Sequence, residues 1–415
     1  MSTPPRPQDN STGNRRPGSA LEVLLVFLRL GCTSFGGPIA HLGYYQAELI
    51  ERRRWCSPSI YAEVIALAQS LPGPASSQVG FTLGILRAGW LGGLAAWLGF
   101  TLPSAALMVV FACGRASFAG PHAQALLHGL QLVAVAVVAQ AILSMRRTLA
   151  PDLPRISLAI AAAAIVLFVS SQFATVAAIA LGAALGLIFF RPSQLKTPED
   201  TAKLQPPLPK IAGVAAGAVF LLLLCFSTVL ATSHAAAPAS VFAAFYRAGA
   251  LVFGGGHVVL PLLETTVVAP GWITQPSFLA GYGAAQAVPG PLFTFAAYLG
   301  ANIGLGALPT PQPLLFALLA LTGLFTPGLL AVAAILPFWS TLRLNPFVRA
   351  ALNGMNASVV GILIAALYKP LWTSTIHRPL DLSLALLAFA LLVLWKWPSW
   401  LVVATIAAVA AVFTL

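Results

Sequence analysis

The strongest constraint on the fold is a pattern of glycine- and proline-rich breaks that occurs twice within apolar sequence. A Phe-Gly-Gly turn is followed by a histidine, a glutamate, a tryptophan and a run that ends in Pro-Gly-Pro. The first copy holds Ser34-Phe35-Gly36-Gly37-Pro38, His41, Glu48, Trp55 and Leu71-Pro72-Gly73-Pro74. The second holds Val252-Phe253-Gly254-Gly255-Gly256, His257, Glu264, Trp272 and Val288-Pro289-Gly290-Pro291. Such self-similarity indicates an internal duplication.

The composition places both copies in a lipid bilayer. The chain of 415 residues is 59% hydrophobic and only 8% charged, against roughly 25% charged residues in an ordinary soluble domain. Its net charge of +12 raises the possibility of a nucleic-acid partner. Most basic residues, however, lie in short gaps between apolar runs, where cytoplasmic loops carry them. We therefore predict an all-α polytopic membrane protein that does not bind nucleic acid.

Charge placement predicts that the two copies have opposite orientations in the membrane. The loop at 51–57 carries Arg52, Arg53 and Arg54, whereas its counterpart at 265–276 has no charged residue. The positive-inside rule expects this difference for inverted repeats, which are typical of secondary transporters. The predicted units are a disordered cytoplasmic tail at 1–19, a first repeat at 20–190, a cytoplasmic linker with one connecting helix at 191–239, and an inverted second repeat at 240–415.

Each repeat is expected to contain broken helices. A spanning helix needs roughly 20 apolar residues, and glycine and proline divide the motif regions into shorter pieces. The predicted pieces are 21–34, 38–50, 58–71, 75–87, 241–253, 257–268, 276–288 and 292–305. Longer spans are expected at 88–113, 122–145, 312–338 and 350–368, and hairpin-like pairs at 156–190 and 380–415. Broken helices are tolerated in a bilayer where they face protein or a water-lined cavity.

The breaks predict an anion site. Backbone N–H groups at a helix N-terminus, together with the helix dipole, favour a bound anion, and Pro38, Gly256, Pro74 and Pro291 begin such helices. Glycine and proline can also serve packing alone, but their repetition beside polar residues favours a site. The candidate substrate-binding residues are Arg29, Phe35, Gly36, Gly37, His41, Pro74, Ser76, Ser77, Gln78, Arg247, Gly254, Gly255, Gly256, His257, Gln286, Gly290 and Thr294.

Ionisable groups inside the apolar runs are candidates for proton coupling, because burying a charge in the membrane is costly. The candidates are Glu48, Glu264, His41 and His257. Each glutamate lies about two turns after its histidine and so on the same helix face, where the pair could relay protons or only hold the helix in place. Arg29 and Arg247 could neutralise an anion or pair with a glutamate, although Arg247 could instead extend to the membrane interface. Glu63 has no acidic counterpart and is interpreted as structural.

The sequence contains no recognisable catalytic or cofactor motif. We find no phosphate-binding loop, nucleophile elbow or paired zinc histidines. Cys32, Cys56, Cys113 and Cys225 lie too far apart to suggest a disulfide framework or a metal site. One histidine and one carboxylate per repeat form a weak metal site. We therefore predict no catalytic residues, no metal and no cofactor, and a transporter that is not an enzyme.

At these motifs the sequence resembles the chromate ion transporter (CHR) family in its long, two-domain form. The resemblance covers nearly all of residues 20–415, and its most specific stretches are 34–38 with His41, 71–78, 253–257 and 281–291. It implies a multi-pass protein of the bacterial inner membrane, with a cytoplasmic N-terminus, that exports chromate using the proton gradient and so gives resistance. Sulfate is a related oxyanion. Transport of sulfate or another oxyanion, including uptake, stays open, as does a membrane-bound chromate reductase or sensor. The oligomeric state also stays open.

Overall fold

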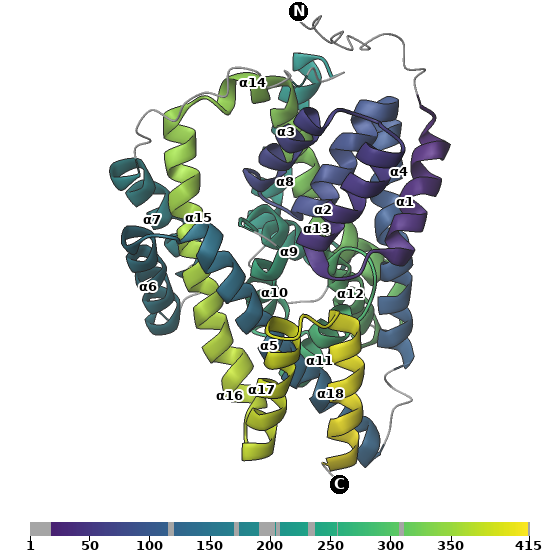
Figure 1. Cartoon of the computed structure of the whole chain (residues 1–415), viewed down its shortest axis with the longest axis vertical. Helices are drawn as coiled ribbons and strands as arrows, with labels where there is room; N and C mark the ends of the chain where they lie inside the picture. The colour runs from purple at the N-terminus through teal and green to yellow at the C-terminus, as the bar shows by residue number, and fades with distance from the viewer. Residues whose placement is uncertain are drawn as a thin grey trace, which may run out of the picture.

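The structure is a computed structural model that describes residues 18–114, 120–169, 174–190, 204, 208–230, 237–254, 256–306 and 311–413. Every regular element in these ranges is a helix, and the predicted all-α class is confirmed. The helices form a tall bundle in which α14 lies near one end and α18 near the other (Figure 1). Of the tail predicted at 1–19, only Gly18 and Ser19 lie within the described residues, and Ser19 caps the first helix by accepting a hydrogen bond from the Glu22 N–H.

The first repeat folds close to the predicted pieces. It contains α1 (Ala20–Thr33), α2 (Gly37–Tyr45), the π-helix η1 (Gln46–Arg52), α3 (Pro58–Gln69), α4 (Ala75–Gly114), α5 (Pro121–Leu149), α6 (Leu153–Phe168) and α7 (Ala174–Phe189). Ser57 and Asp152 cap α3 and α6, with proline in the first turn of each helix. The backbone of α4 is non-helical at Ala88 and Gly89, which is the predicted boundary between 75–87 and 88–113.

One helix, α8 (Lys210–Val229), connects the first repeat to the second. The second repeat contains α9 (Pro238–Ala250), η4 (Gly256–Val258), α10 (Val259–Val267), α11 (Gln275–Ala285), η5 (Leu292–Thr294), α12 (Phe295–Gly306), α13 (Pro313–Ile335), η6 (Leu336–Phe338), α14 (Trp339–Leu342), α15 (Pro346–Ala366), η7 (Leu367–Trp372), α16 (Thr373–Thr375), α17 (Pro379–Val393) and α18 (Ser399–Phe413). The short helices between its glycine and proline breaks occur in the same order as those of the first repeat.

Several helices are suited to span a membrane. Within the described residues, five helical stretches are long and apolar enough to cross a bilayer: Ala75–Gly114, Gln124–Leu149, Lys210–Val229, Pro313–Leu342 and Pro346–Thr375. Large apolar side chains such as Leu21, Leu25 and Leu91 are exposed on the outside of the bundle. A water-soluble protein would bury much of this surface, whereas lipid accommodates it. The chain is therefore a multi-pass membrane protein.

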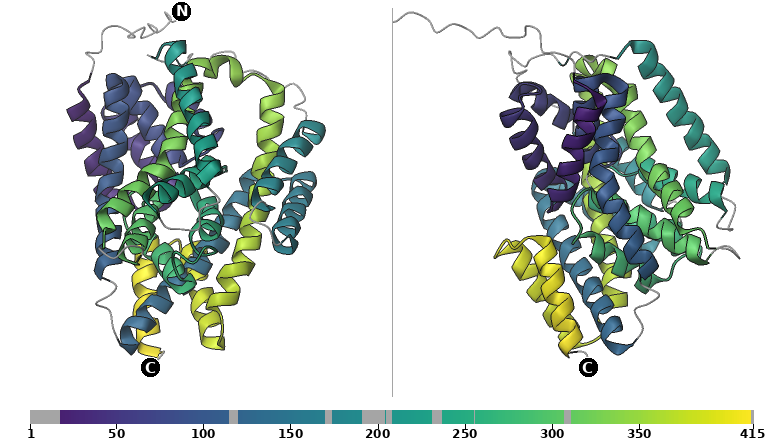
Figure 2. Two further views of the ribbon diagram at one scale, coloured as in Figure 1. Left: turned by 180° about the vertical axis from the view of Figure 1, so that it is seen from behind. Right: turned by 90° about the vertical axis from the view of Figure 1, so that its right-hand side faces the viewer.

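The two repeats are interlocked through their terminal helix pairs. α6 and α7 pack on α15 of the second repeat, and α17 and α18 pack on α5 of the first; Figure 2 shows both pairs from two further sides. Glycines allow the close approach: a Cβ on Gly129 of α5 would lie 2.7 Å from the Cα of Ala407 on α18. Gly354 of α15 meets Gly182 and Gly186 of α7 in the same way. Each repeat thus completes the packing of the other.

Candidate functional site

Turns from the two repeats are joined by a reciprocal pair of hydrogen bonds. The N–H of Gly73, in the first Pro-Gly-Pro loop, donates to the carbonyl of Val252 at 2.7 Å. The N–H of Gly290, in the second Pro-Gly-Pro loop, donates to the carbonyl of Ser34 at 2.8 Å. Ser34 and Val252 immediately precede the two Phe-Gly-Gly turns. Each Pro-Gly-Pro loop therefore binds the Phe-Gly-Gly turn of the opposite repeat.

Glycine is required at both donors of this pair. Gly73 has φ +122° and Gly290 has φ +96°, values that side chains other than glycine rarely adopt. A Cβ on Gly73 would lie 2.8 Å from the Cα of Gly328, and one on Gly290 would lie 2.7 Å from the Oγ of Ser104. Both close approaches are made to the opposite repeat. The Pro-Gly-Pro motif therefore permits the contact between repeats as well as the break in the helix.

Gln78 strengthens the same junction. Its side chain is fully buried in the first turns of α4, and its Nε2 donates to the carbonyls of Pro72 at 2.7 Å and Gly328 at 3.1 Å. An amide has two N–H donors, and both are used here. The predicted role of Gln78 as a substrate donor is not supported by this geometry, because only its Oε1 acceptor stays without a partner among the described residues. The side chain instead ties the α3–α4 loop to α13.

His41 is buried beside the N-terminus of α4. Its side chain is 0% exposed, its Nδ1 lies 3.3 Å from the Oγ of Ser76, and its ring meets Phe100 edge-on with 5.1 Å between centroids. Its Nε2 has no hydrogen bond of normal geometry within the described residues, although the ring also interacts with the Ser34 backbone. The structure thus brings His41 and Ser76 together and places them beside Ser34.

Several other polar groups near this position are buried without partners. The hydroxyls of Ser34, Ser77 and Thr101 make no hydrogen bond within the described residues, and each of these residues is at most 2% exposed. Buried polar groups without partners are uncommon in folded proteins. The N-terminus of α4 adds backbone N–H groups that the helix itself does not use. We call these hydroxyls, His41, Ser76 and the N-terminus of α4 the donor cluster, because their chemistry suits an oxyanion.

Ser34 and Thr101 were missed as candidate site residues. Both lie in stretches whose repetition is visible in the sequence, before Phe35-Gly36 and after Phe100. Serine and threonine in a membrane helix commonly bond to a carbonyl of their own helix, so a hydroxyl alone carries little signal. Only the structure shows that these two hydroxyls lack such a bond.

The equivalent residues of the second repeat are placed differently. Thr294 is buried, but its hydroxyl donates to the Pro291 carbonyl at 2.8 Å. Gln286 lies beside the α11 end of the loop, where its backbone carbonyl accepts from Ser399 at 3.0 Å and its side chain interacts with Tyr282. A Cβ on Gly256 would lie 3.3 Å from the Cγ of Pro38, so the two Phe-Gly-Gly turns also adjoin. Gly255 and the side chain of His257 lie outside the described residues.

Other predicted glycines and Phe35 border the turns. Gly36 and Gly254 have positive φ angles of 101° and 76° and so form the tight turns, as does Gly37 at the start of α2. Phe35 contacts Trp400 of α18 with 6.3 Å between ring centroids. Pro74 directly precedes α4 and adjoins Gly328. These residues shape the junction, and their side chains offer no hydrogen-bond donor to an anion.

The two candidate coupling acids occupy unlike surroundings. Glu48, on η1, forms ion pairs with Arg52 at 2.9 Å and Arg53 at 2.7 Å. Glu264, on α10, is half-buried and makes no ion pair or side-chain hydrogen bond of normal geometry within the described residues. Glu48 is therefore bound to two arginines at the loop, whereas Glu264 interacts electrostatically with Lys369 without forming an ion pair among the described residues.

The two candidate arginines do not join the cluster of donors. Arg29 is exposed on α1 beside Leu25 and Leu28. Arg247 donates to the carbonyl of Ser227 at 2.9 Å, near the C-terminal end of α8. A cation at a helix C-terminus interacts favourably with the helix dipole, which gives Arg247 a structural role. Neither position supports the predicted neutralisation of a bound anion.

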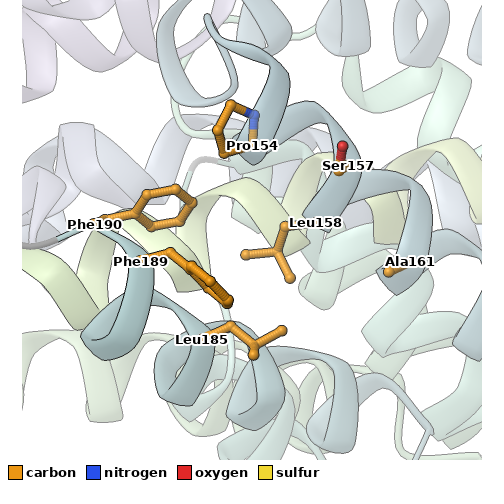
Figure 3. A pocket seen from close by; sticks show the side chains of 7 residues that line it. All are labelled: Pro154, Ser157, Leu158, Ala161, Leu185, Phe189 and Phe190. Carbon is orange, nitrogen blue, oxygen red and sulfur yellow. The ribbon is translucent and has the colours of Figure 1, made fainter.

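An apolar groove between α6 and α7 is a poor candidate for an anion site. Figure 3 shows Leu158, Leu185 and Phe189 turned toward the same space, which has a volume of about 320 Å³. The lining residues are Pro154, Ser157, Leu158, Ala161, Leu185, Phe189 and Phe190. The residues that the structure describes also contain no cluster of three or more His, Cys, Asp or Glu side chains suited to a metal ion. The junction between the repeats is the better candidate.

A duplicated set of broken membrane helices that meet between two halves is the architecture of a class of membrane transporters. The family model described as "Chromate transporter" matches residues 21–187 and 239–412. The chain belongs to this family.

Curated relatives agree with this assignment. The chain is 30% identical over 394 residues to a chromate transport protein of Pseudomonas aeruginosa, covering 92% of this chain and 88% of the relative. It is 26% identical over 404 residues to a chromate transport protein of Cupriavidus metallidurans, covering 95% and 94%. A probable chromate transport protein of Synechococcus elongatus is 28% identical over 353 residues, with 84% of each chain covered. No solved structure matches the chain.

Proposed function

We propose that this protein exports chromate from the cytoplasm across the bacterial inner membrane and thereby lowers the intracellular chromate level. Membership of the chromate transporter family supports the substrate. The observation that carries the site is the set of buried hydroxyls on Ser34, Ser77 and Thr101 that have no partner among the described residues, together with the buried His41 beside Ser76. Export, inner-membrane location and a cytoplasmic N-terminus follow from the family resemblance and from the arginines of the loop at 51–57.

Chromate is a tetrahedral dianion, and the donor cluster suits its chemistry. Hydroxyl O–H groups and backbone N–H groups at the start of α4 would each donate to an oxyanion oxygen, and the helix dipole would stabilise its charge. Protonation of His41 would add a positive charge, and its Nε2, which makes no hydrogen bond of normal geometry within the described residues, would then be able to donate to the anion. The site needs no metal and no redox group, so chromate would leave the protein unchanged. We do not assign a catalytic role to any residue.

Proton coupling would use a carboxylate that changes its charge during the cycle. Glu264 suits this role better than Glu48, because Arg52 and Arg53 hold Glu48 in ion pairs. Proton uptake by Glu264 or His41 at the acidic side of the membrane would couple the gradient to chromate release. Movement of one repeat against the other would then alternate access to the junction.

Transport into everted vesicles tests the proposal. Purified protein in vesicles with an acidic lumen should accumulate isotope-labelled chromate, and dissipating the pH gradient should reduce the uptake. Competition by sulfate, molybdate and phosphate ranks the oxyanions, and recovery of unreduced chromate from the lumen distinguishes transport from reduction. Uptake equal to that of protein-free vesicles would exclude the proposal, and a preference for sulfate would reassign the substrate.

A further inference from the structure

Glu63 forms a buried contact between the repeats that has no part in the donor cluster. It lies in the middle of α3 and is 9% exposed. One carboxylate oxygen accepts a hydrogen bond from the Trp339 Nε1 at 3.0 Å, and the other is paired with the guanidinium of Arg343. Trp339 begins α14 and Arg343 follows it, just after α13. Both partners of Glu63 therefore belong to the second repeat.

The contact is local, and its removal would leave unpaired polar groups. Trp339 is 8% exposed, so its indole N–H has little access to water. A buried carboxylate is costly unless it is both paired and hydrogen-bonded, and Glu63 satisfies both conditions only while α14 stays beside α3. The basic loop at 51–57 precedes α3, and Arg343 and Arg349 follow α13. The positive-inside rule places both of these segments on the cytoplasmic side.

The counterpart of α3 in the second repeat is held in another way. Aligning Trp55 with Trp272, and the two Pro-Gly-Pro loops with each other, matches Glu63 with Ala280 on α11. α11 packs directly on α5 of the opposite repeat. There the Gln131 Nε2 donates to the Pro276 carbonyl at 3.1 Å, and Gly283 lies tightly against Leu130. Close apolar packing therefore fixes α11.

Among the described residues, α3 has no equally extensive helix packing against the opposite repeat. It packs on α4 and η1 of its own repeat, and comparable packing on α15 is absent among the described residues. Its buried apolar side chains share a cluster with Val332, Leu336 and Trp339 of the second repeat, and Glu63 adds a polar contact with Trp339 and Arg343. When a polar pair separates, each of its groups can form a hydrogen bond with water instead. When two close-packed helices separate, their van der Waals contacts are lost without replacement. α3 is therefore better suited to move relative to the opposite repeat than α11 is.

We propose that Glu63, Trp339 and Arg343 form a latch that holds α3 on the cytoplasmic side and opens in each transport cycle. The inference rests on the proposed transport function and deepens it. Glu63 is a positioning residue: it touches no substrate and acts by controlling the position of the hairpin that leads to Gly73. Opening the latch would release α3 from α14 and give the junction access to the cytoplasm.

Cross-linking tests whether the latch must open. The four native cysteines, Cys32, Cys56, Cys113 and Cys225, are first replaced by serine, and Glu63→Cys and Arg343→Cys are introduced together. A short bifunctional thiol reagent should reduce chromate uptake to the level of empty vesicles. Each single cysteine variant, treated identically, should retain its uptake. Full uptake by the cross-linked pair would overturn the latch.

Glu22 and Arg87 provide a matched control. They form an ion pair at 3.1 Å between α1 and α4, and both helices belong to the first repeat. Cross-linking Glu22→Cys to Arg87→Cys should leave uptake largely intact, because α1 and α4 are expected to move together. If this control also stops transport, the loss in the Glu63 pair is not specific to contacts between repeats and the inference fails.

Thiol labelling gives a readout that does not depend on the substrate. Cys56 is 9% exposed and directly precedes Ser57, the N-cap of α3. With Cys56 as the sole cysteine, Glu63→Gln should increase its rate of labelling by a maleimide several-fold, whereas Glu22→Gln should not. Unchanged labelling in a folded Glu63→Gln protein would contradict the latch. If wild-type protein transports no chromate, the proposed function fails, and the labelling still decides whether the latch exists.

Discussion

The two repeats share their helix breaks but differ in the side chains that stand beside them. Ser34, Ser76 and Gln78 of the first repeat align with Val252, Phe293 and Phe295 of the second. Where a hydroxyl is kept in both, its bonding differs. Thr101 is unpartnered among the described residues, whereas the equivalent Thr326 donates to the Thr322 carbonyl at 2.6 Å. The comparison teaches that the two repeats share an architecture, while the polar groups beside the breaks differ between them.

The largest expected effect comes from the feature that the repeats share. Gly73→Ala and Gly290→Ala should each destabilise the protein by about 1–3 kcal/mol through backbone strain and by roughly 1–3 kcal/mol more through overpacking. Gly89→Ala is the control, because Gly89 also has positive φ but no atom would lie within 4 Å of its Cβ. Thermal unfolding in detergent should rank both junction variants well below Gly89→Ala. Equal melting temperatures would show that the reciprocal junction is not tightly packed.

Thr101 and Thr326 test whether binding is confined to the first repeat. A hydrogen bond to a charged group contributes about 1.5–3 kcal/mol, so Thr101→Val should weaken chromate uptake at limiting substrate by roughly 10- to 100-fold. Thr326→Val should stay near wild type, because its hydroxyl bonds within α13. Initial uptake rates at several chromate concentrations measure both. Equal losses in the two variants would mean that the repeats share the substrate.

Glu48 and Glu264 allow the same comparison for proton coupling. Glu264→Gln should make uptake insensitive to the pH gradient, because the amide cannot exchange a proton. Glu48→Gln should retain this sensitivity and lose only partly exposed ion pairs, each contributing about 0–1 kcal/mol. Uptake with and without an imposed pH gradient provides the measurement. A gradient response that disappears only in Glu48→Gln would reverse the assignment.

The smallest effects are expected at the two candidate arginines, Arg247 and Arg29. Arg247→Leu should lower stability by about 1 kcal/mol, because it removes the hydrogen bond to the Ser227 carbonyl of α8. Arg29→Leu should change stability by less than about 0.5 kcal/mol, as is usual for an exposed position. Denaturation midpoints of the two variants should differ in that order. A larger loss for Arg29→Leu would reveal a partner for this side chain.

The helix boundaries were accessible from the sequence because their causes are local. Clustered glycine and proline favour the end of a helix, so Pro72-Gly73-Pro74 and its copy predicted the breaks and the pieces between them, whereas the single prolines Pro103 and Pro327 lie inside α4 and α13. Partners far apart along the chain leave no such local sign. Glu63 was interpreted as structural because it has no acidic counterpart, and its pairing with Trp339 and Arg343 depends on how α3 meets α14.

The side-chain chemistry of the site was predicted less well than its position. His41 and Ser76 do meet beside the junction, because both follow a helix break within the same repeat. Gln78 was expected to bind substrate, but Gly328 of the opposite repeat takes its amide hydrogen bond. Arg247 was expected near an anion, but α8 supplies its acceptor. In each case a long-range contact decides which donors stay available.

The crossed packing of the terminal helix pairs also constrains how the protein is made. α6 and α7 are synthesised well before α15, the helix on which they pack. During synthesis the small-residue face of α7 around Gly182 and Gly186 must therefore remain in the membrane without its final partner, α15. The nascent first repeat cannot reach its finished tertiary structure when it leaves the ribosome. Membrane insertion and folding are thus separated in time, and quality control must tolerate an incomplete first repeat until the second arrives.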